Sequence, residues 1–204
     1  MLKGCTPWPD EFARRYRDAG YWEGLSLWSM LECSIGRWPR KIALSHGARR
    51  LTYTELGAAI AALSVRLLEQ GLRPLDRAVV QMPNGIEFVV AFFALVRIGV
   101  IPVLALPVHR RAEIDHFVAH SGAVAYLAAD RIRDFDYRPM ATEIAAARPA
   151  LRHVLVLGEP GPGQTSLQAL MRMAAPHDAA ARLAPHATDS GEVALMLLSG
   201  GTTG

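Results

Sequence analysis

The sequence has little cysteine and only a small excess of charge. Its two cysteines, Cys5 and Cys33, lie far apart and form no C-x-x-C pair. This pattern excludes a small disulfide-stapled scaffold and favours free thiols in a reducing compartment. Twenty-two lysines and arginines against 19 acidic residues give a net charge of +3. Because these basic residues are scattered and not interleaved with a series of aromatic residues, nucleic acid is not an expected partner.

Long apolar runs and sequence repeats are also missing. The most hydrophobic stretch, residues 86–103, is interrupted by Glu87, Arg97 and Pro102, so it is too short and too broken to span a bilayer. Residues 1–10 contain no apolar core of the length found in signal peptides. We therefore expect a cytoplasmic protein without a membrane partner. No heptad series or internal repeat indicates a coiled coil or a solenoid.

A large apolar fraction is what the sequence does have. Of the 204 residues, 51% are hydrophobic and 20% are charged, which excludes a disordered chain and suffices for a sizeable core. Apolar strands are expected at residues 78–82, 100–106, 124–128, 154–157 and 193–198, and helices at 86–98, 111–121, 141–147 and 166–173. Strands that are apolar on both faces and alternate with helices predict an α/β fold. Its sheet is mostly parallel and covered by helices on both faces.

The first forty residues form a separate unit in this prediction. Periodic apolar residues predict helices at 9–19 and 25–38, so residues 1–40 are expected to be a helical extension. Residues 41–204 are expected to be the first α/β portion of a larger domain. This portion begins with a hairpin, followed by a helix that Thr52 and Glu55 start with a capping box. Residues 174–190 have the composition of a linker. Asn84 is the expected N-cap of the helix at residues 86–98.

Four tryptophans lie within the extension: Trp8, Trp22, Trp28 and Trp38. Such an aromatic cluster can form a surface that binds a ligand or a carrier. It can also fasten the extension to the main domain, because each indole buries a large area. We favour the second interpretation.

The clearest chemical signal is the loop after the last strand. An apolar strand ends there in a run of small and hydroxyl-bearing residues: Ser199, Gly200, Gly201, Thr202, Thr203 and Gly204. Glycines let several backbone N–H groups point at one anion, and the hydroxyls add donors, so the run suits phosphate. Its spacing differs from G-x-x-x-x-G-K-[ST], which disfavours a P-loop NTPase. A flexible glycine-rich linker is the alternative reading of the same residues.

Histidines suggest a second, weaker hypothesis. His116 and His120 lie four apart on a predicted helix, with Glu113 and His109 nearby, and two such histidines can share a zinc ion if a third ligand arrives. The sequence has no H-E-x-x-H motif, and histidines on solvated helix faces are common. We therefore predict no metal site in these residues. We also predict no catalytic role for either cysteine, because no nearby residue in the sequence supplies a general base or stabilises a thiolate.

Several segments, in order, resemble the adenylate-forming superfamily. The run Leu198–Gly204 is similar to its phosphate loop, in which Gly-x-Pro-Lys follows, and residues 51–56 (LTYTEL) are similar to another of its motifs. Residues 8–17 with 20–22, 80–84 and 102–110 resemble one branch, the aryl-acid–AMP ligases that activate salicylate or 2,3-dihydroxybenzoate for siderophore assembly. The resemblance covers essentially the whole chain.

The resemblance implies a two-step enzyme. An aryl acid attacks the α-phosphorus of Mg²⁺-bound ATP, giving aryl-AMP and pyrophosphate. The aryl group then passes to the phosphopantetheine thiol of an aryl carrier protein domain. By the same resemblance, the loop from Ser199 to Gly204 wraps the β- and γ-phosphates.

Much of such an enzyme lies outside these residues. The loop lysine, the aryl pocket, the adenine contacts and the C-terminal domain with its catalytic lysine have no counterpart here, so no catalytic residue is assigned and residues 1–204 alone are expected to be inactive. Two alternatives stay open. One is an acyl- or aryl-CoA ligase of the same superfamily, and the other is a non-catalytic nucleotide-binding module.

Overall fold

The computed structural model describes residues 2, 4–186 and 188–197. Its helices are α1 (Asp10–Asp18), α2 (Leu27–Arg37), α3 (Tyr53–Glu69), α4 (Ile86–Arg97), α5 (Arg111–Ser121), α6 (Tyr137–Ala147), α7 (Leu167–Arg172), α8 (Ala179–Leu183) and the 3₁₀ turn η1 (Ala184–His186). Its strands are β1 (Ile42–His46), β2 (Arg49–Thr52), β3 (Arg77–Gln81), β4 (Ile101–Leu104), β5 (Ala125–Ala129), β6 (Arg131–Ile132), β7 (Phe135–Asp136), β8 (His153–Leu157), β9 (Thr165–Ser166) and β10 (Met196–Leu197).

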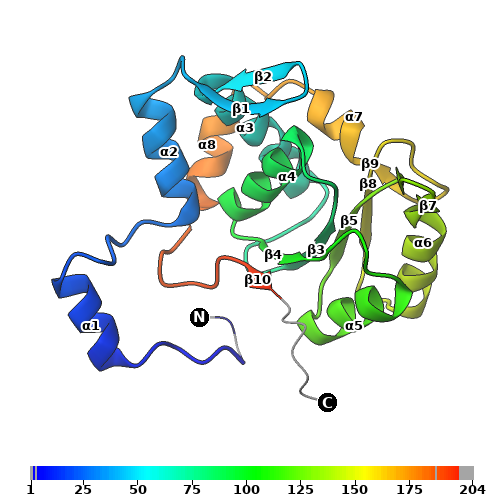
Figure 1. Ribbon diagram of the computed structural model, residues 1–204, viewed down its shortest axis with the longest axis horizontal. Helices are drawn as coiled ribbons and strands as arrows, with labels where there is room; N and C mark the ends of the chain where they lie inside the picture. Colours follow the sequence, from blue (N-terminus) through cyan, green and yellow to red (C-terminus); the bar gives the residue numbers. More distant parts are fainter. Residues whose placement is uncertain (1, 3, 187, 198–204) are drawn as a thin grey trace.

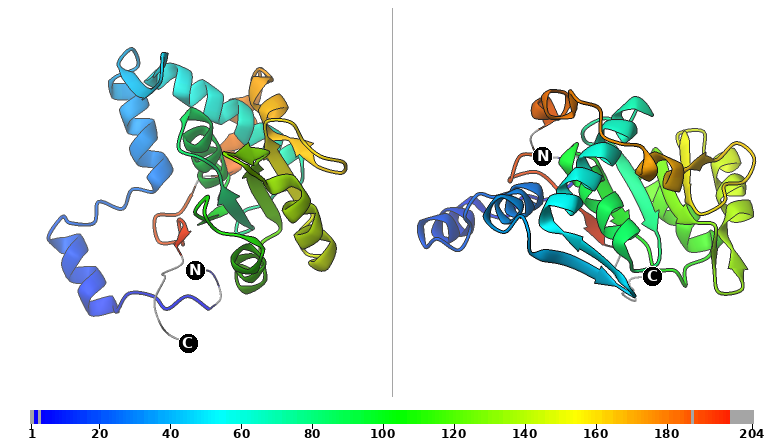
Figure 2. Two further views of the ribbon diagram at one scale, coloured as in Figure 1. Left: turned by 45° about the vertical axis from the view of Figure 1, so that its right-hand side comes forward. Right: turned by 90° about the horizontal axis from the view of Figure 1, so that it is seen from above.

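A parallel sheet forms the centre of the molecule (Figure 1). Among the described residues six strands build it, in the order β10-β4-β3-β5-β8-β9, and every neighbouring pair runs parallel. Helices α3 and α4 cover one face, and α5 and α6 cover the other (Figures 1 and 2). The predicted α/β fold with a covered parallel sheet is therefore confirmed.

Alternating side chains of the strands divide the core into two layers. In β3, Val80 packs toward α3 and α4 whereas Val79 packs toward α5 and α6. Strand β5 repeats the pattern with Leu127 on the first face and Tyr126 on the second. Successive strand residues point to opposite faces, so both faces need cover. Each large apolar side chain buried in this way contributes roughly 1.5–3 kcal/mol.

Helix α3 begins as its sequence predicts. The N–H of Thr52 donates to a Glu55 carboxylate oxygen at 2.7 Å, and the N–H of Glu55 donates to the Thr52 hydroxyl at 3.2 Å. These two bonds are a capping box, which satisfies backbone donors that the first helical turn leaves free. The helix then buries one stripe of residues against α4 and the sheet, and the chain turns at Gly71, where φ is +100°.

Three expectations for local structure are wrong. The stretch 174–190 is not simply a linker, because α8 lies within it and buries Leu183 against the core beneath α3. Helix α6 starts at Tyr137 instead of residue 141, since the Asp136 carboxylate accepts the N–H of Arg138 and proline is tolerated in a first helical turn. The N-cap of α4 is Gly85, with no side-chain bond, so Asn84 does not cap it.

The tryptophans of the extension do not behave alike. Trp28 is 8% exposed and packs into the core, with the guanidinium of Arg97 3.9 Å from its ring centroid. The other three are substantially exposed, and Trp8 and Trp22 form an aromatic cluster with Tyr16. Trp28 is therefore the one of the four that is buried between residues 1–40 and the α/β portion, while Trp38 contacts Tyr53 of α3 with ring centroids 6.5 Å apart. None of the helices in the described part of the chain is long and apolar enough to cross a bilayer.

Candidate functional site

The carboxyl edge of the sheet, where the parallel strands end, is the candidate site. Strand β10 lies beside β4, with Met196 opposite Val103 and Leu197 opposite Leu104. Because the strands are parallel, β10 ends with Leu197 at the same edge at which β4 ends with Leu104. Open α/β sheets bind their ligands outside the carboxyl ends of the strands. The direction of β10 therefore agrees with a ligand loop after it.

The predicted phosphate loop itself lies outside the described residues. Its members are Ser199, Gly200, Gly201, Thr202, Thr203 and Gly204. Their role stays a prediction. The described residues around the carboxyl edge define the geometry of the candidate site.

A second loop, residues 105–110, folds over the end of β3. The side-chain amide of Gln81, the last residue of β3, donates to the carbonyl of Leu106 at 2.8 Å and to that of His109 at 2.9 Å. Its amide oxygen accepts the hydroxyl of Tyr126, which stands on the neighbouring strand β5. Burial raises the pKa of Tyr126 well above its ordinary value, so this hydroxyl keeps its proton and remains a donor.

Two further side chains fix the same loop, Tyr137 from α6 and Arg110 from the loop itself. The Tyr137 hydroxyl donates to the Pro107 carbonyl at 2.6 Å. One guanidinium nitrogen of Arg110 lies within 3.0 Å of the carbonyls of Pro107, Val108 and His109, and its carbon lies 4.0 Å from the Phe135 ring centroid. Four successive carbonyls, from residue 106 to residue 109, thus accept side-chain donors, which leaves the loop little freedom.

The position of the 105–110 loop has a topological meaning. From β3 the chain passes to β4 on one side and then to β5 on the other, so the connections reverse direction at β3. Helix α4 packs on one face and α5 on the opposite face. Ligand sites of open α/β sheets lie at such a switch point. The loop therefore forms a wall of the place where the topology predicts a ligand.

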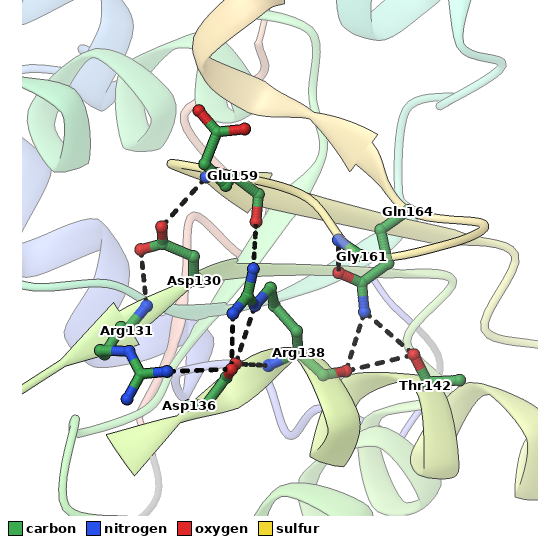
Figure 3. A network of polar contacts seen from close by, with 8 residues as sticks. All are labelled: Asp130, Arg131, Asp136, Arg138, Thr142, Glu159, Gly161 and Gln164. Carbon is green, nitrogen blue, oxygen red and sulfur yellow. Dashed lines mark hydrogen bonds and ion pairs between the residues drawn. The ribbon is translucent and has the colours of Figure 1, made fainter. Parts of the chain in front are cut away.

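A network of polar contacts holds the remaining strand ends together (Figure 3). The Asp130 carboxylate, directly after β5, accepts the N–H of Arg131 at 2.6 Å and that of Glu159, beyond β8, at 3.0 Å. Arg138 pairs with Asp136 at 2.6 Å and also donates to the Glu159 carbonyl at 3.3 Å. The Arg138 guanidinium lowers the pKa of Asp136 to about 2. We call these residues, with Thr142, Gly161 and Gln164, the Asp130 network.

The other candidates from the sequence do not assemble into a site. The rings of His116 and His120 stack with centroids 5.5 Å apart, and the Nδ1 atom of His109 is already used to accept the N–H of Leu106. No group of three or more histidine, cysteine or acidic residues that could hold a metal ion exists in the described part of the chain. Both cysteines are free.

The aromatic residues of the extension border a hollow of their own. A cavity of about 700 Å³ lies between the start of the chain and Ser190–Gly191, and Trp8, Tyr21 and Trp22 line it. It belongs to the extension and not to the 105–110 loop, so we do not assign it to the candidate site.

Comparison with known proteins decides the family. The sequence profile described as "AMP-binding enzyme" matches residues 31–204. This chain belongs to the AMP-binding enzyme family. It is similar over its whole length to salicyl-AMP ligase / salicyl-S-ArCP synthetase of Mycobacterium tuberculosis at 43% identity, and to 2,3-dihydroxybenzoate-AMP ligase of Bacillus subtilis at 36%. The chain spans 36% of the length of each of these AMP-binding enzymes.

Two solved structures agree with the fold. The apo structure of Mycobacterium smegmatis MbtA matches 98% of this chain with a TM-score of 0.86 and 40% identity, and the chain covers 36% of it. The N-terminal subdomain of Klebsiella oxytoca NpsA matches 88% with a TM-score of 0.60 at 19% identity. The second likeness concerns the fold alone.

Sequence reasoning missed the residues that brace the edge. The sequence patterns place Gln81 and Tyr126 in apolar strands, and Gln81 and Arg110 in the segments 80–84 and 102–110 that resemble the aryl-acid branch, but they assign no bracing role to these residues or to Asp130 and Arg138. One signal was available: a glutamine at the end of an otherwise apolar strand must find partners when it is buried. The identity of those partners depends on the folded arrangement.

Proposed function

We propose that this chain is the N-terminal part of an aryl-acid–AMP ligase. Residues 1–40 would be its helical extension and residues 41–204 the first portion of its adenylation domain. The enzyme would convert an aryl carboxylic acid, salicylate or 2,3-dihydroxybenzoate, and ATP into aryl-AMP and pyrophosphate. It would then transfer the aryl group to the phosphopantetheine thiol of an aryl carrier protein in siderophore biosynthesis. The observation that carries the proposal is the similarity along the entire chain to two relatives named for these two acids.

The chain's own contribution to the reaction is the binding of phosphate. A carboxylate oxygen of the acid forms a bond to the α-phosphorus of ATP, and the bond from that phosphorus to the bridging oxygen of pyrophosphate breaks. Backbone N–H groups and hydroxyls of Ser199–Gly204 would hold the β- and γ-phosphates and stabilise the negative charge on the leaving group. The direction of β10 at the carboxyl edge supports this role.

Magnesium belongs to the proposal only as a companion of ATP. Its chemistry would be to neutralise phosphate charge. Proteins usually hold ATP-bound Mg²⁺ with one or two carboxylates together with the phosphates, and the described residues bring no group of three or more acidic, histidine or cysteine side chains together. We assign no magnesium ligand to this part of the chain.

An aryl-CoA ligase is the second candidate function. A specific observation favours it: the chain is 43% identical, over 98% of its length, to 2-hydroxy-7-methoxy-5-methyl-1-naphthoate–CoA ligase of Streptomyces carzinostaticus. Both enzymes would form an acyl adenylate first, so they differ in the thiol that accepts the aryl group. A third possibility, a nucleotide-binding module without catalysis, would form no adenylate.

A cytoplasmic location fits the two free cysteines.

Pyrophosphate exchange tests the proposal. In the whole protein that contains this chain, we expect salicylate or 2,3-dihydroxybenzoate to drive incorporation of labelled pyrophosphate into ATP. A thiol assay would then compare CoA with a phosphopantetheinylated aryl carrier protein, and the carrier should accept the aryl group faster. Residues 1–204 alone should show no exchange. Exchange by the isolated chain would contradict the expected inactivity, and absence of exchange from the whole protein would contradict the enzyme itself.

A further inference from the structure

Gln81 and Tyr126 form a buried polar pair inside an apolar sheet. Both residues are 0% exposed, and both point to the face covered by α5 and α6, between Val79 and Ala128 of the same two strands. A buried amide or hydroxyl costs free energy unless its hydrogen bonds are made. Here Gln81 uses both amide hydrogens and also accepts the Tyr126 hydroxyl. The pair is therefore fully satisfied, a condition in which buried polar networks rigidify their surroundings.

The partners of the pair identify what is being held. Gln81 donates to the carbonyls of Leu106 and His109 in the 105–110 loop and to no strand. The same loop exposes two apolar side chains, Leu106 at 61% and Val108 at 67%. The pair thus fixes the shape and the direction of the loop.

The location of the loop connects it with the chemistry. It follows β4, whose last residue, Leu104, lies opposite Leu197 of β10, and Leu197 precedes the first residue of the predicted phosphate loop, Ser199, by two positions. It also covers the end of β3, where the direction of the strand connections reverses. A segment in this place borders the site that the topology assigns to a ligand.

We propose that Gln81 and Tyr126 are positioning residues for the adenylation reaction: they hold the 105–110 loop in the shape that lets bound ATP react. This inference rests on the proposed function. Neither residue touches substrate in the proposal, since both act through the loop. A displacement of about 1 Å remote from the reacting atoms can lower a rate by about 10²-fold. Loss of the pair should therefore lower kcat/KM for ATP even at temperatures at which the variant remains folded.

The experiment compares three variants in the whole enzyme. Gln81→Met keeps the length of the side chain but removes both donors, and Tyr126→Phe removes one hydroxyl. Ser64→Ala is the matched control, because Ser64 is also fully buried and donates to a backbone carbonyl, that of Ala94, at 3.2 Å. That contact joins α3 to α4 and is remote from the 105–110 loop. Each variant is measured for thermal unfolding and for kcat/KM toward ATP in pyrophosphate exchange, well below its unfolding temperature.

We expect kcat/KM for ATP to fall at least tenfold in Gln81→Met and Tyr126→Phe, and to stay within twofold of wild type in Ser64→Ala. Similar values in all three folded variants would overturn the inference, since stability alone would then explain the pair. If Gln81→Met does not fold, the milder Tyr126→Phe is judged by the same criterion. Absence of exchange from the wild-type enzyme would instead refute the proposed function.

Discussion

Gly158 offers a sharp test of the Asp130 network. It follows β8 with a φ of +104°, and a Cβ built on it would lie only 2.3 Å from a carboxylate oxygen of Asp130. Gly158→Ala therefore imposes two penalties: a backbone conformation that L-residues rarely adopt, and a collision that displaces the Asp130 carboxylate. Gly163, in the same β8–β9 connection, has a φ of +73° but no heavy atom within 4 Å of a built Cβ. Gly163→Ala isolates the first penalty.

The magnitudes separate the two variants. The left-handed conformation costs an ordinary L-residue about 1–2 kcal/mol. The displaced carboxylate would also lose the N–H groups of Arg131 and Glu159, each bond contributing about 1 kcal/mol at this partly exposed site. We expect Gly163→Ala to lower the free energy of unfolding by about 1 kcal/mol and Gly158→Ala by about 3 kcal/mol. Urea denaturation followed by far-ultraviolet circular dichroism measures both. Equal losses would show that the collision with Asp130 has no cost, which would contradict the expected difference.

Two further predictions concern the core and the response to acid. Trp28→Ala should lower the free energy of unfolding by about 3 kcal/mol, because this side chain is buried beneath Arg97. Trp8→Ala, at an exposed indole, should change it by less than about 1 kcal/mol. Denaturant titration compares the two variants, and equal effects would contradict the different roles of the two indoles. The pKa of Asp136 is lowered from its ordinary 3.8 to about 2, so its pairing stabilises the fold above pH 3.8 and this contribution is lost as the pH falls toward 2. Asp136→Asn should flatten the dependence of the free energy of unfolding on pH in that window. If the variant and the wild type lose stability equally on acidification, the ion pair between Asp136 and Arg138 is not the cause of that loss.

Local signals in the sequence were sufficient for most elements. Helix α5 occupies the expected residues because Gly122, with a φ of +62°, ends it. Helix α8 was missed because its residues contain no long apolar stripe. Leu183 becomes apolar core only through its contact with the cluster beneath α3, which is a tertiary effect.

The brace of the carboxyl edge could not be predicted for a related reason. The bonds from Gln81 join residues 25 and 28 positions away, and the bond from Tyr126 spans 45 positions. Periodicity describes each strand by itself and carries no information on which loop folds over its end. The phosphate loop is instead predicted from its composition, since glycine, serine and threonine suit a place where several N–H groups must converge on one anion.

We propose that this chain supplies the phosphate loop of an aryl-acid–AMP ligase. The most direct test of this proposal is aryl-acid-dependent pyrophosphate exchange by the whole protein, measured for wild type and for a variant with Thr202→Ala and Thr203→Ala. We predict exchange that depends on salicylate or 2,3-dihydroxybenzoate, and a loss of about 10²-fold or more in the variant, the effect of removing donors that stabilise developing charge. Exchange that needs no aryl acid would contradict the proposed aryl-acid–AMP ligase. Exchange that the loop variant retains in full would contradict the role of residues 199–204 as its phosphate loop.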